Sequence, residues 1–136
     1  MTDIREIWKV CEQENITVDS VSCPRCGSFS VMVDGLCFIA LDCALPERQV
    51  KEHAAHEVGH CVKGAFYNIS SPLDVVSQHE YRADKWAIEK LVPRDQLIGQ
   101  IRKNNDSLYL LAEHFGVTED FIRKACLHYG LYNEPF

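Results

Sequence analysis

The chain has 136 residues, 46% of them hydrophobic, and a formal net charge of −6 at pH 7. This length suits one compact domain with a sizeable core. The acidic balance disfavours broad electrostatic attraction to nucleic acid or an anionic membrane, and no stretch approaches the about 18 apolar residues of a membrane span. The opening segment MTDIREIWKVCEQEN lacks the basic and apolar regions of a signal peptide, so we expect a cytoplasmic protein.

The first expected elements are a helix and a small sheet. Apolar residues recur at helical spacing from Ile4 to Cys11, which predicts an amphipathic helix in DIREIWKVCEQE. Two β-rich runs follow, SFSVMV and LCFIAL, and the Asp34-Gly35 pair between them predicts a hairpin. The segment ITV before them is a candidate for a short third strand.

The rest of the chain is expected to be helical. One helix should begin at Pro46 and run to about residue 66, and a second should span roughly 74–91 and stop before Pro93. RDQLIGQIRKN is a further helix. The segment SLYLLAEHFGVTEDFIRKACLHYG reads as two helices around Gly116, with Thr118 as the N-cap of the second.

The first long helix carries the pattern H-E-x-x-H at His56, Glu57 and His60. Residues four apart lie on one helix face, so both imidazoles can bind one metal ion. Glu57 lies next to the first histidine, where it can take a proton from a water that the metal activates. The alternative is a surface helix with scattered histidines, and a third ligand decides between the two.

Glu80 on the next helix is the candidate third ligand, because it follows His60 by 20 residues and Asp84 lies one turn further along the same face. Glu80 can bind zinc while Asp84 accepts a hydrogen bond from a ligating histidine. This arrangement is that of the thermolysin-like peptidases with two histidines and one glutamate. His53 and His79 compete as ligands, but substrate contact, oxyanion contact or surface exposure explains them more simply.

These motifs resemble the ImmA/IrrE family of small metallopeptidases over roughly residues 15–128. In that family a β-hairpin precedes H-E-x-x-H, and a helix of the form E-x-x-A-[DN]-x-[FW]-A-x-x-L-[LMV]-x-P follows, to which the segment from Glu80 to Pro93 corresponds here. The tail LAEHFGVTEDFIRKA is similar to the family's helix-turn-helix-like end. The segment CPRCG, residues 23–27, departs from the family, whose members usually have a glycine-bearing loop there.

The resemblance implies an α+β fold. A small antiparallel β-hairpin or sheet would pack on a mainly helical, zincin-like metallopeptidase domain of residues 1–104, followed by a C-terminal helix-turn-helix-like unit of residues 105–136. It also implies a single catalytic Zn²⁺ and a substrate that is a helix-turn-helix transcriptional repressor of a phage, mobile element or stress regulon. The residues carried over are the ligands His56, His60 and Glu80 and the base Glu57; Asp84 matches the [DN] position of the family's second motif.

Cleavage also needs a donor to the oxyanion besides the metal. The candidates for this donor or for substrate contact are Tyr81, His79, His53 and Tyr67. The hairpin can offer an exposed edge to which an extended substrate segment adds as a strand.

Seven cysteines are a high and odd count, and in a cytoplasmic chain reduced thiols or metal ligands are the default expectation. Cys23 and Cys26 have the spacing of half a zinc knuckle. Cys37 and Cys43 have poor spacing for the other half, so the interpretation as unpaired thiols is favoured. The other three are interpreted as small buried hydrophobic residues: Cys11, Cys61 and Cys126.

Two hypotheses from other classes stay open. A DNA-binding regulator could be built on the last two helices, but the second of these offers Arg123 and Lys124 against Glu119 and Asp120, which favours packing or substrate docking. A protein-binding regulator with a structural zinc would have no use for Glu57 beside the first histidine, and no convincing fourth ligand is present.

Overall fold

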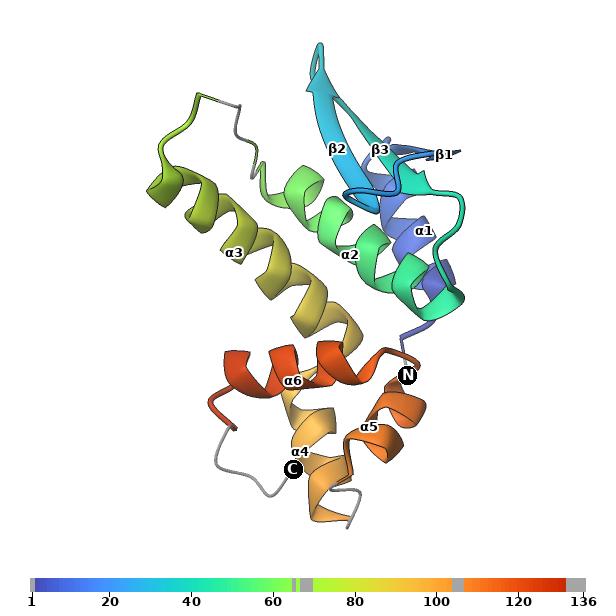
Figure 1. Ribbon diagram of the computed structural model, residues 1–136, viewed down its shortest axis with the longest axis vertical. Helices are drawn as coiled ribbons and strands as arrows, with labels where there is room; N and C mark the ends of the chain where they lie inside the picture. The colour runs from blue at the N-terminus through green and yellow to red at the C-terminus, as the bar shows by residue number, and fades with distance from the viewer. Residues whose placement is uncertain (1, 65, 67–69, 104–106, 132–136) are drawn as a thin grey trace.

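The structure is a computed structural model that describes residues 2–64, 66, 70–103 and 107–131 (Figure 1). These residues form helices and a three-stranded sheet, so the predicted α+β class is confirmed. The helices are α1 (Ile4–Gln13), α2 (Glu47–Lys63), α3 (Leu73–Leu91), α4 (Arg94–Arg102), α5 (Leu108–Phe115) and α6 (Glu119–His128). The strands are β1 (Thr17–Val21), β2 (Ser28–Val33) and β3 (Leu36–Asp42).

The β2–β3 hairpin turns at Asp34-Gly35, as the sequence predicts. Both turn residues have positive φ, 51° and 80°, which a two-residue type I′ turn requires. β1 joins the other side of β3 and runs parallel to it, so the sheet has the order β1-β3-β2 and is mixed, not purely antiparallel. The reason is a crossover: the segment between β1 and β2 passes the end of β3, where Asp42 N–H donates to the carbonyl of Gly27.

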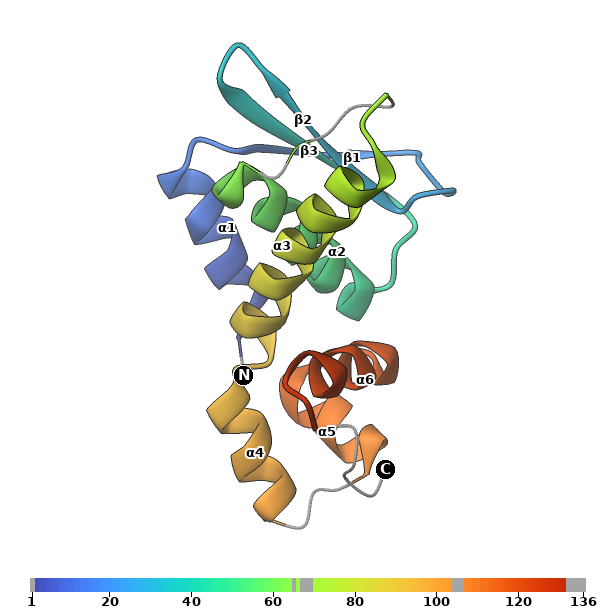
Figure 2. The same cartoon turned by 90° about the vertical axis from the view of Figure 1, so that its left-hand side faces the viewer.

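One face of the sheet packs on the helices (Figure 2). Cys37, Ile39 and Leu41 alternate along β3 and are at most 7% exposed, in one hydrophobic cluster with Ala54 and Val58 of α2. This alternation is the period-two pattern of a strand with one buried face. The sheet therefore forms a layer over α1 and α2.

α2 and α3 pack against each other along their length. Gly59 permits this close approach, because a Cβ at that position would lie 2.7 Å from the backbone oxygen of Ala83. α2 ends at Lys63 rather than at residue 66, since Gly64 takes a left-handed conformation with φ 60° that terminates the helix. This close packing of α2 and α3 positions the residues of the candidate site.

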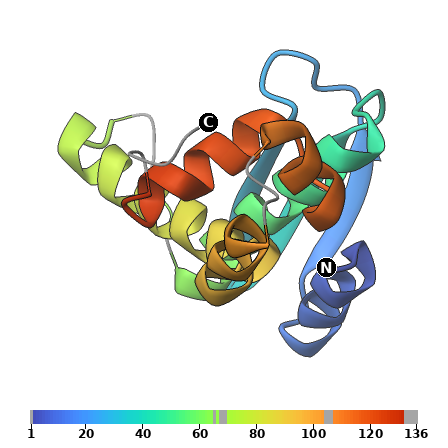
Figure 3. The ribbon, with the colours of Figure 1, turned by 90° about the horizontal axis from the view of Figure 1, so that it is seen from below.

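α4, α5 and α6 gather at one end of the molecule (Figure 1), the end seen face-on in orange and red in Figure 3. Gly116 is left-handed between α5 and α6, and the Thr118 side chain accepts the N–H of Phe121, so both predicted helix-end signals are confirmed. Lys51 of α2 is 6% exposed and donates to the carbonyl of Phe115 at 2.9 Å. Leu111 and Phe115 of α5 belong to the same hydrophobic cluster as the residues of α2 and α3.

The cysteines correct one expectation. Cys37 on β3 and Cys61 on α2 form a disulfide. Cys61 is therefore a half-buried disulfide cysteine, and the expectation of a small buried thiol at this position is wrong. The Cα atoms of Cys37 and Cys61 are 6.0 Å apart, within the range that a disulfide spans. Cys11 and Cys126 are buried, as predicted, and burial raises the pKa of Cys11 to about 11. No helix in the described part of the chain is long and apolar enough to cross a bilayer.

Candidate metal centre

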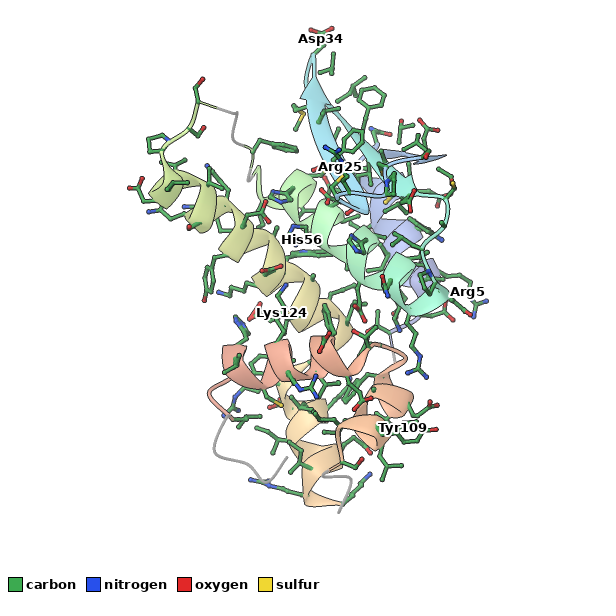
Figure 4. All side chains as sticks on the ribbon, viewed as in Figure 1. Arg5, Arg25, Asp34, His56, Tyr109 and Lys124 are labelled. Carbon is green, nitrogen blue, oxygen red and sulfur yellow. A yellow bond between two sulfur atoms is a disulfide. The ribbon has the colours of Figure 1, made fainter. Side chains whose placement is uncertain are left out.

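α2 and α3 bring three predicted ligands together. His56 and His60 lie one turn apart on α2, and their Nε2 atoms are 3.2 Å from each other. Glu80 faces them from α3, with one carboxylate oxygen 2.9 Å from Nε2 of His56 and the other 3.3 Å from Nε2 of His60. Figure 4 shows His56 on the side of α2 that faces α3.

This donor set fits a small divalent cation. Two imidazole nitrogens and a carboxylate oxygen are ligands that zinc accepts, and a tetrahedral ion with bonds of about 2.0–2.1 Å holds its ligand atoms about 3.3 Å apart. The three observed contacts lie close to that value. Among the histidine, cysteine, aspartate and glutamate side chains of the described residues, only His56, His60 and Glu80 form a group of three that could hold a metal ion. Their ligand atoms all lie within 4.8 Å of one another.

Asp84 supports His56 from the far side of the ring. Its Oδ1 lies 2.8 Å from Nδ1 of His56, and the amino group of Lys124 donates to the same oxygen at 2.9 Å. Burial raises the pKa of Asp84, but the hydrogen bonds of His56 and Lys124 outweigh this effect and lower the pKa overall. An ionised Asp84 accepts the Nδ1 proton of His56 and leaves Nε2 directed at His60 and Glu80.

The net pKa of His56 is raised. Burial lowers the pKa of this imidazole, whereas the hydrogen bond and charge of Asp84, with the charges of Glu57 and Glu80, raise it by more. The surroundings of His56 therefore favour positive charge at this point. A bound divalent cation would satisfy the same three carboxylates.

Glu57 points from α2 toward the sheet and is 6% exposed. Its Oε2 accepts the hydroxyl of Ser28 at 2.8 Å, and its Oε1 accepts the hydroxyl of Ser30 at 2.7 Å. Sequence reasoning missed both serines. The available signal was their alternation in SFSVMV, which places two hydroxyls on one face of an otherwise apolar strand.

Among the predicted substrate or oxyanion residues that the structure describes, His53 is the one in this network. Its Nδ1 lies 2.7 Å from Oγ of Ser28. Burial lowers the pKa of His53. The charge of Glu57 raises this pKa, whereas the charges of His56 and Lys124 lower it further, and the net shift is downward. His53 is thus predominantly neutral at pH 7.

A cleft of about 640 Å³ lies over these groups. β2 contributes one wall, α6 contributes Phe121 and Lys124, and Cys26 and Phe66 add to the lining from outside the helices and strands, while α2 and α3 form the remainder. The lining residues are Cys26, Ser28, Phe29, Ser30, Glu52, His53, His56, Glu57, His60, Phe66, Glu80, Asp84, Ala87, Phe121 and Lys124. The candidate ligands, Glu57 and His53 therefore share one cavity.

The other predicted contacts are not brought into the cleft. Tyr81 is 58% exposed and lies near His128, with ring centroids 6.1 Å apart and ring planes tilted by 46°. Neither Tyr81 nor His79 is among the described residues that line the cavity. Tyr67 lies outside the described residues. Cys26 lies at the cleft and is exposed, 3.9 Å from the carbonyl of Cys23.

A second metal site is not formed by the cysteines within the described part of the chain. No third histidine, cysteine or carboxylate completes a cluster with Cys23 and Cys26 there. The basic residues of α6 are also engaged: Arg123 pairs with Asp120 at 2.6 Å and Lys124 pairs with Asp84. Neither observation favours a structural zinc or a DNA-recognition helix.

The chain matches the family model of the peptidase M78 group, described as the IrrE N-terminal-like domain, over residues 29–127. The matched segment includes all of the candidate metal centre together with Glu57 and Asp84. Neither a curated protein nor a solved structure matches the chain.

Proposed function

The chain belongs to the peptidase M78 family of IrrE N-terminal-like domains, a group of metallopeptidases of the ImmA/IrrE type, and from this premise we propose that it is a zinc endopeptidase. One observation carries the proposal. His56, His60 and Glu80 converge in the same cleft as Glu57, so a metal and a base can act on one peptide bond. The proposed substrate is a protein, whose chain enters the cleft in an extended form.

His56, His60 and Glu80 would hold one Zn²⁺, and Asp84 would keep Nε2 of His56 directed at it. A bound zinc ion supplies Lewis acidity, which polarises a peptide carbonyl and lowers the pKa of water. The carboxylate of Glu57 takes one proton from the attacking water as the new bond forms between the water oxygen and the carbonyl carbon. Glu57 then gives this proton to the amide nitrogen as the C–N bond breaks, which leaves a carboxylic acid and an amine; transfer of the acid's proton to the amine gives the carboxylate and the ammonium present at neutral pH.

The edge of the sheet supports binding of an extended peptide. β2 is an outer strand, so one row of its backbone groups has no partner strand among the described residues. Ser28 and Ser30 place this strand directly beside the cleft. A substrate segment that pairs with β2 would pass between the sheet and α6, where Phe121 and Lys124 would meet its side chains.

We propose a helix-turn-helix transcriptional repressor as the natural substrate, one encoded near this chain on a phage, mobile element or stress regulon. The support is the resemblance to repressor-cleaving members of the ImmA/IrrE family. A regulator that binds DNA through α6 is the weaker candidate, because both Arg123 and Lys124 are committed to ion pairs within the chain.

The test is cleavage by the zinc-loaded full chain of two substrates, a proteome-derived peptide library and an intact neighbouring repressor, with new termini read by mass spectrometry. The matched control is His56→Ala/His60→Ala, loaded in the same way. We expect new termini in the peptide library or the repressor that require the two histidines. Identical termini with both proteins, or none in either substrate, would contradict the peptidase function.

A further inference from the structure

We propose that Ser28 and Ser30 are positioning residues that hold the carboxylate of Glu57 in one orientation for proton transfer, and that Ser28 also fixes the tautomer of His53. This inference rests on the proposed peptidase function. Its physical basis is a hydrogen-bond network in which Ser28 and Ser30 both donate to the carboxylate of Glu57, while Nδ1 of His53 lies within hydrogen-bonding distance of Oγ of Ser28, with all three distances 2.7–2.8 Å.

The two serines occupy positions where the fold alone would favour apolar side chains. Ser28 pairs with Leu41 and Ser30 pairs with Ile39 across the sheet, so all four face the helices. Leu41 and Ile39 are buried in the hydrophobic core. Hydroxyls on this face therefore need a polar partner, and the partner of both is the carboxylate of Glu57.

Each serine holds a different oxygen of the carboxylate. Two donors on two oxygens fix the plane of the group as well as its distance from β2, which one donor could not do. A free glutamate side chain loses considerable rotamer entropy when it is ordered. The serines impose this order before substrate arrives, and catalysis gains from such preorganisation.

A serine hydroxyl also suits both states of a base. It donates to an ionised carboxylate, and after rotation it accepts from a protonated one. Glu57 can therefore take up and release a proton at an oxygen while Ser28 and Ser30 stay in place. A backbone N–H or a lysine in their position could only donate, so it could not accept a hydrogen bond in return.

Ser28 determines which nitrogen of His53 carries the proton. Its hydroxyl has one proton, which it donates to Oε2 of Glu57, so its oxygen must accept from Nδ1–H of His53. Neutral His53 is then the Nδ1–H tautomer, and its Nε2 is an acceptor. The backbone makes room for the ring, because a Cβ on Gly27 would lie 2.7 Å from Cε1 of His53.

The kinetic test uses the zinc-loaded full chain and the best-cleaved peptide of the library. In Ser28→Ala/Ser30→Ala we expect kcat to fall by about 10- to 100-fold, part of the usual contribution of a positioned base, with zinc content unchanged and KM within about twofold. Ser30→Thr keeps a hydroxyl and should retain most of the kcat lost in Ser30→Ala. The matched control is Ser20→Ala, an exposed serine of β1. An unchanged kcat in the double variant, or a loss in Ser30→Thr equal to that in Ser30→Ala, would overturn the proposal.

A second readout does not depend on peptidase activity. The ring nitrogens of ¹⁵N-histidine-labelled, zinc-loaded protein report each tautomer by NMR, and His53→Gln assigns the signal of His53. We expect the Nδ1–H tautomer in wild type and in Ser20→Ala, and a shift toward Nε2–H in Ser28→Ala. If the wild type cleaves substrate but His53 is the Nε2–H tautomer, the proposed role of Ser28 is contradicted while the peptidase function stands. A wild type with the expected tautomer that cleaves no substrate contradicts the proposed function, and the positioning role with it.

Discussion

The amino group of Lys124 on α6 donates to Oδ1 of Asp84 on α3 over 2.9 Å, although 40 residues separate them in the chain. Figure 4 shows Lys124 on the side of α6 that faces α3. The same oxygen of Asp84 lies 2.8 Å from Nδ1 of His56. The carboxylate of Asp84 therefore bonds both to Lys124 of α6 and to the His56 ring that would bind the metal. α6 therefore belongs to the surroundings of the candidate metal centre as well as to the core.

Asp84→Asn should weaken zinc affinity by about 10- to 100-fold, because the amide lacks the charge that holds and polarises His56. The overall fold should be retained, since Asn has nearly the same shape. Titration against a competing chelator measures the affinity. Asp34→Asn is the matched control, in an exposed turn whose positive φ tolerates asparagine. Equal affinities in wild type and Asp84→Asn would remove Asp84 from the metal centre.

Glu80→Ala should abolish most of the thermal stabilisation that zinc gives the chelator-treated protein. At a free zinc concentration about 100 times Kd, binding to the folded state alone adds about 2.7 kcal/mol to the free energy of unfolding. Thermal unfolding with and without zinc measures this gain. Glu89→Ala alters an exposed glutamate of the same helix and should keep the whole gain. The same gain in Glu80→Ala as in wild type would show that the third ligand is another group.

The Cys37–Cys61 pair predicts five free thiols among the seven cysteines of protein purified without reductant. Reduction should raise the thiol count to seven. It should also lower the free energy of unfolding by about 3 kcal/mol, because the disulfide closes a 24-residue loop in the unfolded chain. Cys37→Ser should lose this sensitivity to reductant, whereas Cys43→Ser should keep it. Seven thiols before reduction would contradict the disulfide.

Glu52 should make the stability of the protein depend on pH. Burial raises the pKa of Glu52 above 4.5, against the lowering effect of hydrogen bonds from Thr118. The folded protein therefore binds the Glu52 proton more tightly than the unfolded chain does. The contribution of Glu52 to stability is then greatest below pH 4.5 and declines as pH rises through its folded pKa.

Glu52→Gln removes this titration but keeps a side chain that can bond to Thr118. Relative to wild type, the variant should gain free energy of unfolding between pH 4 and pH 7, measured by denaturant titration at each pH. Glu12→Gln, an exposed substitution on α1, should show no such trend. A gain that is constant with pH, or that shrinks toward pH 7, would contradict the raised pKa.

Local patterns made much of this structure predictable. His56 and His60 lie on one face because they are four residues apart in a helix, and the same rule aligns Glu80 with Asp84. Asp34-Gly35 carries the turn conformation in its own residues. Each of these features depends on residues within a few positions of one another, so it can be predicted from a short stretch of sequence.

Contacts between distant segments could not be predicted in this way. The parallel placement of β1, the Cys37–Cys61 disulfide and the bond from Lys124 to Asp84 depend on how whole elements pack. Ser28 is the clearest example, because a serine in a strand is ordinary until α2 brings Glu57 against it. Such pairs have no fixed spacing in the sequence.

Glu57→Gln separates the proposed base from the metal ligands. Glutamine keeps the shape of the side chain and can bond to Ser28 and Ser30, but it cannot take a proton from water. Zinc per chain, by elemental analysis, should equal that of wild type, while cleavage of the best peptide substrate should fall by at least about 100-fold. Cleavage at the wild-type rate with zinc bound would contradict the account, and loss of zinc together with activity would show that Glu57 binds the metal rather than acting as the base.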